Sequence, residues 1–293
     1  MKIDFFLMGR KGLKVLEHVC RLPHRSLVNC VVTARDSGMQ EDYADAIASV
    51  CGANGIDFFE RNAYKDMPSA DYRILAGWKW MVKEANTIVL HDALLPAYRG
   101  FAPLVNALIN GEKEIGATAI WAAERYDAGP IITRESIQVS GPLRINDALD
   151  VMAGLYVKII AGILDDLAGQ RPLAAMQQDE TMATYSLWRD EDDYFIDWNE
   201  DSNRIWRSVY ALSFPYKGAC TLLSDHKIII EDAVPVKDVT VMNRQAGKVL
   251  FMEEGLPVVV CGSGLLKIIS AVDSSGQSIL PLARFRSRFF SPI

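Results

Sequence analysis

The fold is decided by residues 87–133, which read TIVLHDALLPAYRGFAPLVNALINGEKEIGATAIWAAERYDAGPIIT. A short apolar run, Thr87 to Leu90, predicts a buried strand that places His91 at its end. A second strand is expected around Ala117 to Ala123, and it leads into a tight turn that contains Asp127. We therefore expect an imidazole and a carboxylate, each at a strand-to-loop junction, to share one site.

The connection between these two strands also has a readable pattern. Leu94-Leu95-Pro96 must leave the first strand, because proline cannot donate to a continuing ladder. Arg99-Gly100 places a cation beside a residue that allows close backbone approach. Pro103 suits the first turn of a helix and Asn110-Gly111 suits its end, so a helix is predicted between them.

The preceding residues alternate between strand and helix patterns. Lys2 to Met8 is an apolar strand, and Gly9 to Gly12 is expected to turn it into a helix that begins near Leu13. Further strands are expected at 27–33, 56–59 and 72–77, with a helix at 41–51. This alternation predicts an α/β fold with an open, mainly parallel, Rossmann-like sheet and helices on both faces. In such sheets the site forms beyond the carboxyl ends of the strands, where His91 and Asp127 are expected.

The second half of the chain changes character twice. Ile145 to Leu167 predicts a scaffold helix whose apolar face contains Leu149, Met152, Tyr156, Ile159, Ile163 and Leu167. The helical pattern fades over residues 175–203, where acidic residues at 190–193 indicate a solvated linker. Short strand patterns between 220 and 271 then predict a small OB-like β-barrel. We expect a first domain at 1–185, a linker at 186–203 and a second domain at 204–293.

Composition limits the class of protein. Half of the 293 residues are hydrophobic and 23% are charged, which is typical of a soluble globular protein. Five scattered cysteines suit reduced thiols in the cytosol, and four histidines without ligand spacing predict no metal site. The glycines at 9–12 lack the full fingerprint of dinucleotide-binding proteins, which disfavours the binding of NAD or FAD. Without a signal peptide or an apolar run that could span a membrane, we expect a cytoplasmic protein that does not bind membranes.

The stretch at 87–133 resembles the formyltransferases that use 10-formyltetrahydrofolate, in particular the branch acting on nucleotide sugars, typified by the formyltransferase of UDP-4-amino-4-deoxy-arabinose. The resemblance extends into the linker and the second domain through residues 194–198 and 214–219. The matching pieces are His91, Leu94-Leu95-Pro96, Tyr98-Arg99-Gly100, Ala102-Pro103, Asn110-Gly111, Gly116, Thr118 and Asp127-Ala128-Gly129. This family uses Asn, His and Asp, but the Asn position is Val89 here, and the serine before Leu-Leu-Pro is Ala93.

The resemblance implies roles for these residues. His91 and Asp127 would be catalytic, since an imidazole titrates near neutrality and a carboxylate can orient it. The alternative for His91 is a hydrogen-bonded structural residue. The folate donor would contact Trp80, Met81 and Val82 through backbone groups, as well as Leu94, Leu95 and Pro96, although tryptophans here also suit packing. The acceptor would contact Tyr98, Arg99 and Gly100. Asp92 and Arg125 are expected to be solvated charges.

Three functions remain open from the sequence. The first is N-formyl transfer from 10-formyltetrahydrofolate to an amino sugar linked to a nucleotide, for a surface polysaccharide. The second is formylation of methionyl-tRNA, which should require a basic surface. Residues 180–293 contain 12 Lys and Arg against 15 Asp and Glu, and the whole chain has a net charge of −6, which disfavours nucleic acid. The third is a formyltransferase fold retained for binding, motivated by Val89. Oligomeric state stays open, with a homodimer as one option.

Overall fold

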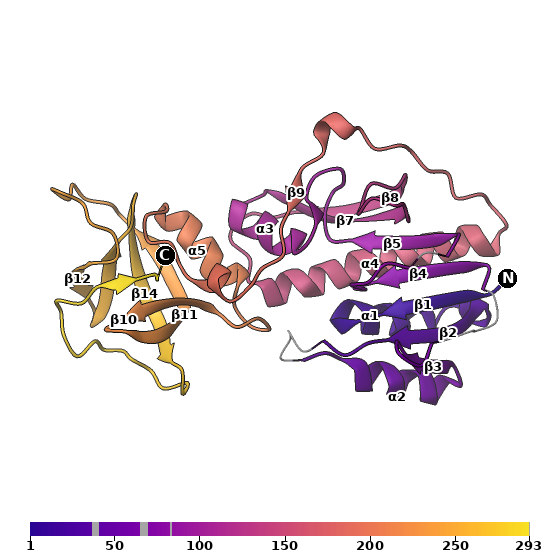
Figure 1. Cartoon of the computed structure of the whole chain (residues 1–293), viewed down its shortest axis with the longest axis horizontal. Helices are drawn as coiled ribbons and strands as arrows, with labels where there is room; N and C mark the ends of the chain where they lie inside the picture. Colours follow the sequence, from indigo (N-terminus) through magenta and orange to yellow (C-terminus); the bar gives the residue numbers. More distant parts are fainter. Residues whose placement is uncertain (37–40, 65–69, 83, 293) are drawn as a thin grey trace. The chain divides into compact units, whose positions relative to one another are not determined.

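The computed structural model describes residues 1–36, 41–64, 70–82 and 84–292. By their contacts, the residues fall into two compact units (Figure 1). The amino-terminal unit contains residues 1–104, 114–138 and 147–187. The carboxy-terminal unit contains residues 105–113, 139–146 and 188–293. Most of the helix α3 (Pro103–Asn110) and the start of the helix α4 (Ile145–Ala168) therefore belong to this unit, although they precede the rest of it in the chain.

The amino-terminal unit is built on a sheet of seven strands in the order β3-β2-β1-β4-β5-β7-β8. The first five strands in this order are mutually parallel, β7 runs antiparallel to β5, and β8 runs antiparallel to β7, so the prediction of a mainly parallel sheet is confirmed. These strands are β1 (Ile3–Leu7), β2 (Val28–Thr33), β3 (Asp57–Glu60), β4 (Tyr72–Ala76), β5 (Thr87–His91), β7 (Glu114–Trp121) and β8 (Ile131–Gln138).

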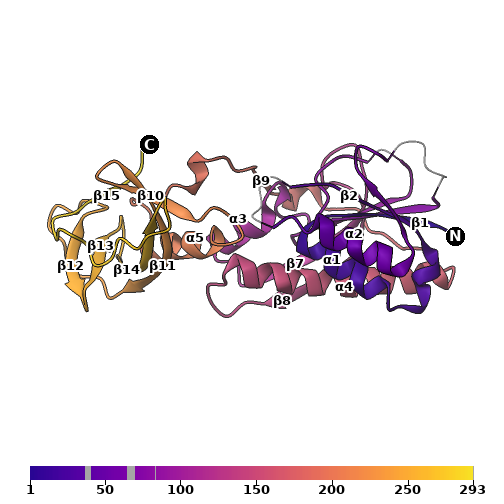
Figure 2. The same cartoon turned by 90° about the horizontal axis from the view of Figure 1, so that it is seen from below.

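The helices α1 (Gly9–Val19), α2 (Ala44–Asn54) and α4 lie on one face of this sheet (Figure 2). Right-handed crossovers from β1 to β2 and from β2 to β3 step in the same direction, so α1 and α2 must cover the same face. The connections from β3 to β4 and from β4 to β5 contain no helix among the described residues. The expectation of helices on both faces is therefore wrong for the described part of this unit, and loops such as residues 77–82 lie at the other face.

The helix α1 begins four residues earlier than its sequence suggests. Its first turn closes at once, since the backbone N of Gly12 donates to the carbonyl of Met8 at 3.1 Å. A Cβ at Gly12 would lie 2.9 Å from the carbonyl carbon of Leu7, so this glycine lets the helix pack closely against β1 instead of making a turn. The expected turn is therefore shorter than predicted: Gly9, with a φ of +62°, makes the turn, whereas Gly12 already lies in the helix and serves close approach.

The long helix α4 matches its prediction. All six residues assigned to its apolar face are buried: Leu149, Met152, Tyr156, Ile159, Ile163 and Leu167. No helix in the described residues combines the length and apolar character needed to cross a bilayer.

The carboxy-terminal unit contains the helix α5 (Ser202–Ala211) and an antiparallel sheet in the order β12-β13-β14-β11-β10-β15. Its strands are β10 (Ala219–Leu223), β11 (His226–Val236), β12 (Val249–Glu253), β13 (Leu256–Val260), β14 (Leu265–Asp273) and β15 (Phe289–Phe290). The sheet curls until its edges meet, because Lys248 and Arg288 form an antiparallel bridge and Phe289 N donates to Gly247 O at 2.8 Å. Removal of free edges is what a barrel accomplishes, and the prediction of a small barrel-like domain is confirmed.

Residues 176–186 are mostly exposed, but hydrogen bonds attach them to the amino-terminal unit. Met176 exchanges two backbone hydrogen bonds of 2.8 Å with Ile131, and β9 (Tyr185–Ser186) pairs in parallel with β6 (Arg99–Gly100). Between them lies the short 3-10 helix Glu180–Met182. We call residues 176–186 the strap, because they run across the loops that follow β5 and β7. The sequence did not predict the strap, because the contacts that hold the strap are mostly with polar and backbone groups.

Candidate active site

His91 and Asp127 come together as predicted, although β7 runs antiparallel to β5 and its carboxyl end, at Trp121, lies beside Ile88 and not beside His91. Nδ1 of His91 lies 3.5 Å from Oδ1 of Asp127, and the two side chains are 8% and 14% exposed. His91 ends the parallel strand β5, whereas Asp127 lies in the loop between β7 and β8. His91 is thus at the carboxyl ends of the parallel strands, the edge where sites form in open α/β sheets, and Asp127 reaches it because the loop after β7 turns back from the opposite end of β5.

The hydrogen bond of the other ring nitrogen fixes the tautomer of His91. Nε2 lies 2.8 Å from the carbonyl oxygen of Tyr98. Because a carbonyl oxygen can only accept, Nε2 must hold a proton and donate it. Nδ1 is then the nitrogen that can gain or release a proton, and it faces Asp127. A proton on Nδ1 is therefore held between an imidazole and a carboxylate.

The carboxylate of Asp127 is oriented by the backbone of Gly100, whose N–H donates to Oδ2 at 2.8 Å. Gly100 has a φ of +101° and a Cβ at this position would lie 2.6 Å from the carbonyl oxygen of Ser186. Only glycine combines this conformation with this close approach. Tyr98, Arg99 and Gly100 thus contact the His–Asp pair or its supports, and their predicted contact with the acceptor stays a prediction.

Arg99 is almost entirely enclosed, with 1% of its side chain exposed. Its guanidinium donates to both carboxylate oxygens of Glu180, at 2.8 and 3.1 Å, and to Oε1 of Gln178, at 2.7 and 3.1 Å. The hydrogen bond with Glu180, the largest cause, raises the pKa of Arg99 above its usual value. Sequence reasoning missed Gln178 and Glu180, since both lie in a polar stretch without a motif.

Asp92 is not a solvated charge, which corrects the sequence-based expectation. It forms an ion pair with Lys11 of α1, and the hydroxyl of Tyr156 donates to Oδ1 at 2.6 Å and to the carbonyl oxygen of Leu90 at 3.0 Å. Side chains alternate along a strand, so the residue after His91 points to the face covered by α1 and α4. Burial would raise the pKa of Asp92, but the Lys11 charge and the hydrogen bonds from Lys11 and Tyr156 hold it below its usual value.

Val89 lies two residues before His91 in β5 and on the same face of the sheet. It packs against a buried cluster that contains Leu95 and Ile120, and against another that contains Phe6 and Leu75. Valine therefore completes an apolar surface at the position where the family pattern has an amide.

The predicted donor-binding residues lie in two loops of this unit. Trp78 packs edge-on against Phe6 and Trp80, with ring centroids 5.1 and 5.2 Å apart, and the Arg61 guanidinium lies 4.3 Å from the Trp80 ring centroid. Within the described residues, the peptide groups of 78–82 make no backbone hydrogen bond, which leaves them open to a ligand that is recognised through the backbone.

The second predicted donor loop, Leu94-Leu95-Pro96, is fixed from below. Thr118 donates to the carbonyl of Ala93 at 2.6 Å and accepts from the N–H of Leu95 at 3.2 Å. Leu95 is fully buried, so its side chain supports the loop from inside. Leu94 and Pro96 are half-buried.

An exposed rim lies next to the pair in sequence. Phe101 and Tyr126 have ring centroids 6.1 Å apart and are 49% and 62% exposed. Arg125 is 67% exposed, and it pairs with Glu180 and donates to the hydroxyl of Tyr185 at 3.4 Å. The expectation that Arg125 is a solvated charge is confirmed.

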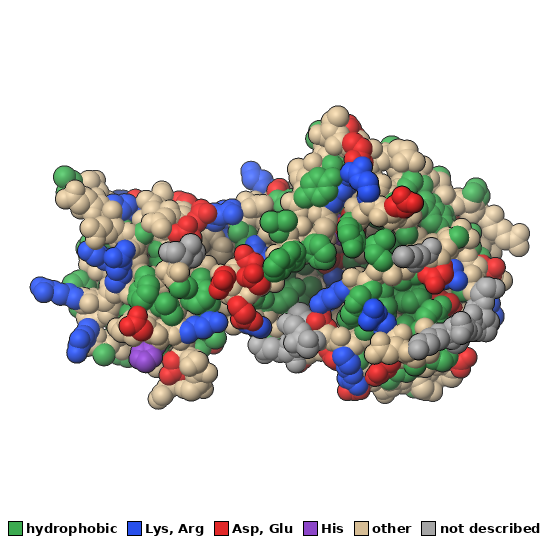
Figure 3. Space-filling model, viewed as in Figure 1, with side chains coloured by type: hydrophobic (Ala, Val, Ile, Leu, Met, Phe, Trp, Pro, Cys, Tyr) green, Lys and Arg blue, Asp and Glu red, His purple; other side chains and the backbone are tan. Residues whose placement is uncertain are grey.

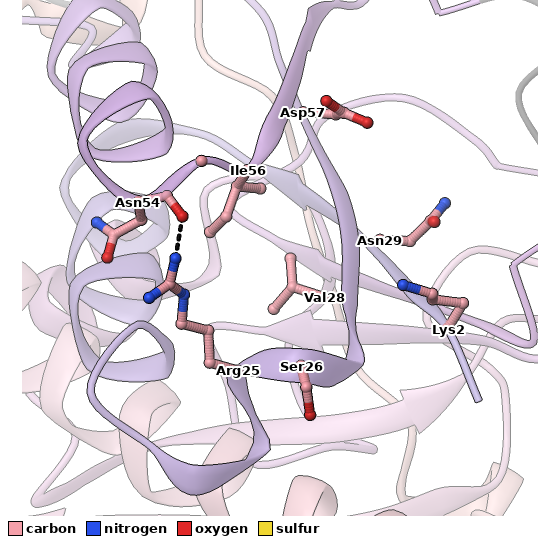
Figure 4. Close-up of a pocket in the computed structure, with 9 residues that line it drawn as sticks. Lys2, Arg25, Ser26, Val28, Asn29, Asn54, Ile56 and Asp57 are labelled. Carbon is pink, nitrogen blue, oxygen red and sulfur yellow. Dashed lines mark hydrogen bonds between the residues drawn. The ribbon is translucent and has the colours of Figure 1, made fainter.

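A cavity of about 540 Å³ lies away from this site (Figure 4). It opens at the amino ends of the parallel strands, between Lys2, Asn29 and Asp57, and Arg25 closes one side by donating to the carbonyl of Asn54. Ligand sites of parallel sheets form at the opposite edge, so we do not assign this cavity to the chemistry of the pair. In the described part of the chain, no three His, Cys, Asp or Glu side chains are grouped to hold a metal ion.

Two segments of the chain match known protein families. Residues 63–149 match the formyl transferase family, and residues 189–289 match the formyl transferase C-terminal domain. The chain belongs to the formyltransferase family. The first match includes His91 and Asp127, and the second includes most of the barrel.

Relatives of this chain include methionyl-tRNA formyltransferases and sugar N-formyltransferases. A methionyl-tRNA formyltransferase from Moorella thermoacetica is 32% identical over 196 residues, which are 67% of this chain and 61% of that relative, so the chain spans about three fifths of the relative's length. The N-formyltransferase from Helicobacter canadensis, solved with folinic acid and dTDP-3-aminofucose, matches with a TM-score of 0.71 at 15% identity, covering 92% of this chain and 98% of that one.

A second solved structure is similar to this chain over nearly its full length. WlaRD, a sugar 3N-formyl transferase solved with dTDP and 5-N-formyl-THF, matches with a TM-score of 0.68 at 14% identity, covering 94% of this chain and 99% of that one. At this identity the likeness shows a common fold.

Proposed function

We propose that this formyltransferase moves a formyl group from 10-formyltetrahydrofolate to the amine of a nucleotide-linked amino sugar. The observation that supports this best is the His91–Asp127 pair with its fixed tautomer. Formyl transfer to an amine needs a proton acceptor, and Nδ1 is the group with an unoccupied lone pair beside a carboxylate. The balance is simple: the amine nitrogen gains the formyl carbon and loses one proton, and the departing folate nitrogen gains one.

In this mechanism Nδ1 of His91 takes the proton that the attacking amine loses, and Asp127 stabilises the resulting imidazolium. The same proton is then available to the nitrogen that leaves the tetrahedral intermediate. Tyr98 O and Gly100 N keep both partners oriented throughout, since each is a backbone group in a fixed position. The folate donor suits the open peptide groups of residues 78–82, which can recognise a pterin ring without polar side chains.

The acceptor class is supported by the rim beside the pair. The exposed guanidinium of Arg125, which pairs with Glu180, suits a phosphate, and the rings of Phe101 and Tyr126 suit a planar base. Both solved relatives described above are sugar N-formyltransferases by their own names or ligands. We propose the nucleotide sugar on these grounds, while the identity of the sugar and of the nucleotide stays open.

Turnover with a panel of nucleotide-linked amino sugars, after a thermal-shift screen of the same panel, tests the proposal. A substrate should raise the melting temperature, and release of tetrahydrofolate should depend on both substrates. His91→Asn and Asp127→Asn should each abolish most of the release while the melting-temperature shift with the acceptor remains. Binding of folate and sugar nucleotide without any release would instead favour a binding protein, the alternative that Val89 suggests.

Methionyl-tRNA formylation is the second candidate, because the relative from Moorella thermoacetica has this name. Acidic residues outnumber basic ones in residues 180–293, and both kinds lie on the carboxy-terminal unit in Figure 3. Affinity for tRNA depends on neutralised phosphates, so weak binding is expected. A gel shift with initiator tRNA at moderate salt separates the two candidates, since tight binding would favour the tRNA substrate.

A further inference from the structure

The turn at residues 127–129 holds the Asp127 carboxylate in an unusual backbone conformation. Asp127 has a φ of +54°, in the left-handed region that side-chain-bearing residues seldom adopt. Gly129 fits directly against β7, because a Cβ there would lie 1.7 Å from the carbonyl oxygen of Trp121. A conformation of this kind persists only when neighbouring groups over-determine it. A second group must therefore hold the other side of the turn.

Gln178 of the strap holds it. Its Nε2 donates to the carbonyl oxygen of Asp127 and to that of Gly129, both at 2.7 Å. Its Oε1 accepts from Nη2 and Nε of Arg99, at 2.7 and 3.1 Å. One half-buried amide thus joins the catalytic turn to a buried guanidinium, with both amide hydrogens and the amide oxygen in use.

The orientation of this amide follows from the chemistry of its partners. A guanidinium only donates and carbonyl oxygens only accept, so Oε1 must face Arg99 and the NH2 group must face the turn. Arg99 is itself fixed, since the carboxylate of Glu180 binds it through two nitrogens. The order of contacts is therefore Glu180, Arg99, Gln178 and then the backbone on either side of Ala128.

We propose that Gln178 is a positioning residue of the active site, acting on Asp127 through the backbone of the turn. Arg99 acts one contact further away, which gives its buried charge a role at the acid–base pair besides the predicted contact with the acceptor. This inference rests on the proposed function, because it assumes that Asp127 orients His91 during formyl transfer. Gln178 lies outside both regions that match the family, so the proposal adds a residue to the active site from a segment without a family match.

Two replacements of Gln178 test the idea. Gln178→Glu keeps the contact with Arg99 but turns a second oxygen toward two carbonyl oxygens, so the turn must shift. Gln178→Met keeps the length and removes all four hydrogen bonds. For both we expect kcat to fall at least tenfold, with KM for each substrate changed less than twofold. Gln177→Glu is the matched control, because this exposed neighbour receives the same change of charge and should retain the kcat of the unaltered protein.

A second readout does not need activity. The chain has four histidines, so the imidazole resonances of His91 can be assigned with a His91→Asn variant. These resonances should move in both Gln178 variants and stay in place in Gln177→Glu. Unaltered resonances together with unaltered kcat would overturn the positioning role, as would a loss that lies wholly in KM. If the unaltered protein shows no turnover, the proposed function fails, while the resonances still decide the role of Gln178.

Discussion

Replacing Val89 by asparagine tests how the site stabilises the oxyanion of the tetrahedral intermediate. An amide at this position would point to the face of the sheet that bears His91, whereas valine presents only methyl groups. One donor aimed at an oxyanion contributes about 2.7 to 4 kcal/mol to the transition state, a hundredfold or more in rate. We therefore expect the unaltered protein to be slow with 10-formyltetrahydrofolate and Val89→Asn to be much faster.

The gain in rate should be accompanied by a loss of stability. Val89 packs against clusters that include Leu95 and Ile120, so removing its methyl groups costs about 1 to 2 kcal/mol of apolar burial. An amide left without a partner in the free protein costs about 1 to 3 kcal/mol more. Urea unfolding should show a lower free energy of unfolding for Val89→Asn, even as its turnover rises.

The assay is release of tetrahydrofolate with a matched amino-sugar nucleotide, measured for the unaltered protein, Val89→Asn and Val89→Leu. Leucine has the branching of asparagine but no donor, so it separates the effect of shape from that of the amide. Only the asparagine variant should be faster. If the unaltered protein is already fast and the asparagine variant is slower, the reasoning about this site is wrong, and another donor serves the oxyanion.

Three further predictions follow from the fold and the site. Asp92→Asn breaks a buried ion pair and should lower the free energy of unfolding at pH 7 by about 3 to 5 kcal/mol. The folded-state pKa of Asp92 lies below its unfolded value, so the difference from the unaltered protein in urea unfolding should persist above about pH 4 and shrink as the pH falls further. Gly100→Ala should reduce kcat at least tenfold, because the new Cβ would meet the carbonyl oxygen of Ser186. Gly141→Ala is the control, since there is open space around its Cβ, and it should leave kcat unchanged. Equal kcat values for the two variants would refute this prediction. Limited proteolysis should cut first within residues 187–193, where the chain passes for the last time from the amino-terminal to the carboxy-terminal unit, and a primary cut inside residues 87–104 or 114–133, which belong to the amino-terminal unit, would contradict the two-unit organisation.

Local signals in the sequence predict most of the fold. Apolar runs of strand length, proline and glycine at element ends, and the spacing of apolar residues in α4 depend on near neighbours, so they can be read without coordinates. His91 and Asp127 were predicted to meet because both residues follow strands of one sheet. They do meet, but that reason applies only to His91, because β7 runs antiparallel to β5 and strand patterns contain no sign of direction.

The rest of the site depends on partners far apart in sequence. Asp92 reads as a solvated charge because Lys11 is 81 residues away, and Gln178 reads as part of a polar linker because Arg99 is 79 residues away. In both cases the polar residue is buried against a partner that only the folded chain supplies, and no local pattern marks such a pair. Val89 differs from these two residues, because an apolar side chain is expected in a buried strand. It is informative only in comparison with the family pattern, which has asparagine at this position.

The strap has a consequence for how the protein is made. A nascent chain that has left the ribosome as far as residue 150 already contains His91 and Asp127, but neither Gln178 nor the backbone of Ser186 that borders Gly100. The proposed acid–base pair is therefore synthesised well before the groups that hold it. A chain truncated before Met176 keeps both residues of this pair and lacks the anchors of its geometry, so we expect that a fragment with the proposed activity must extend at least through Ser186.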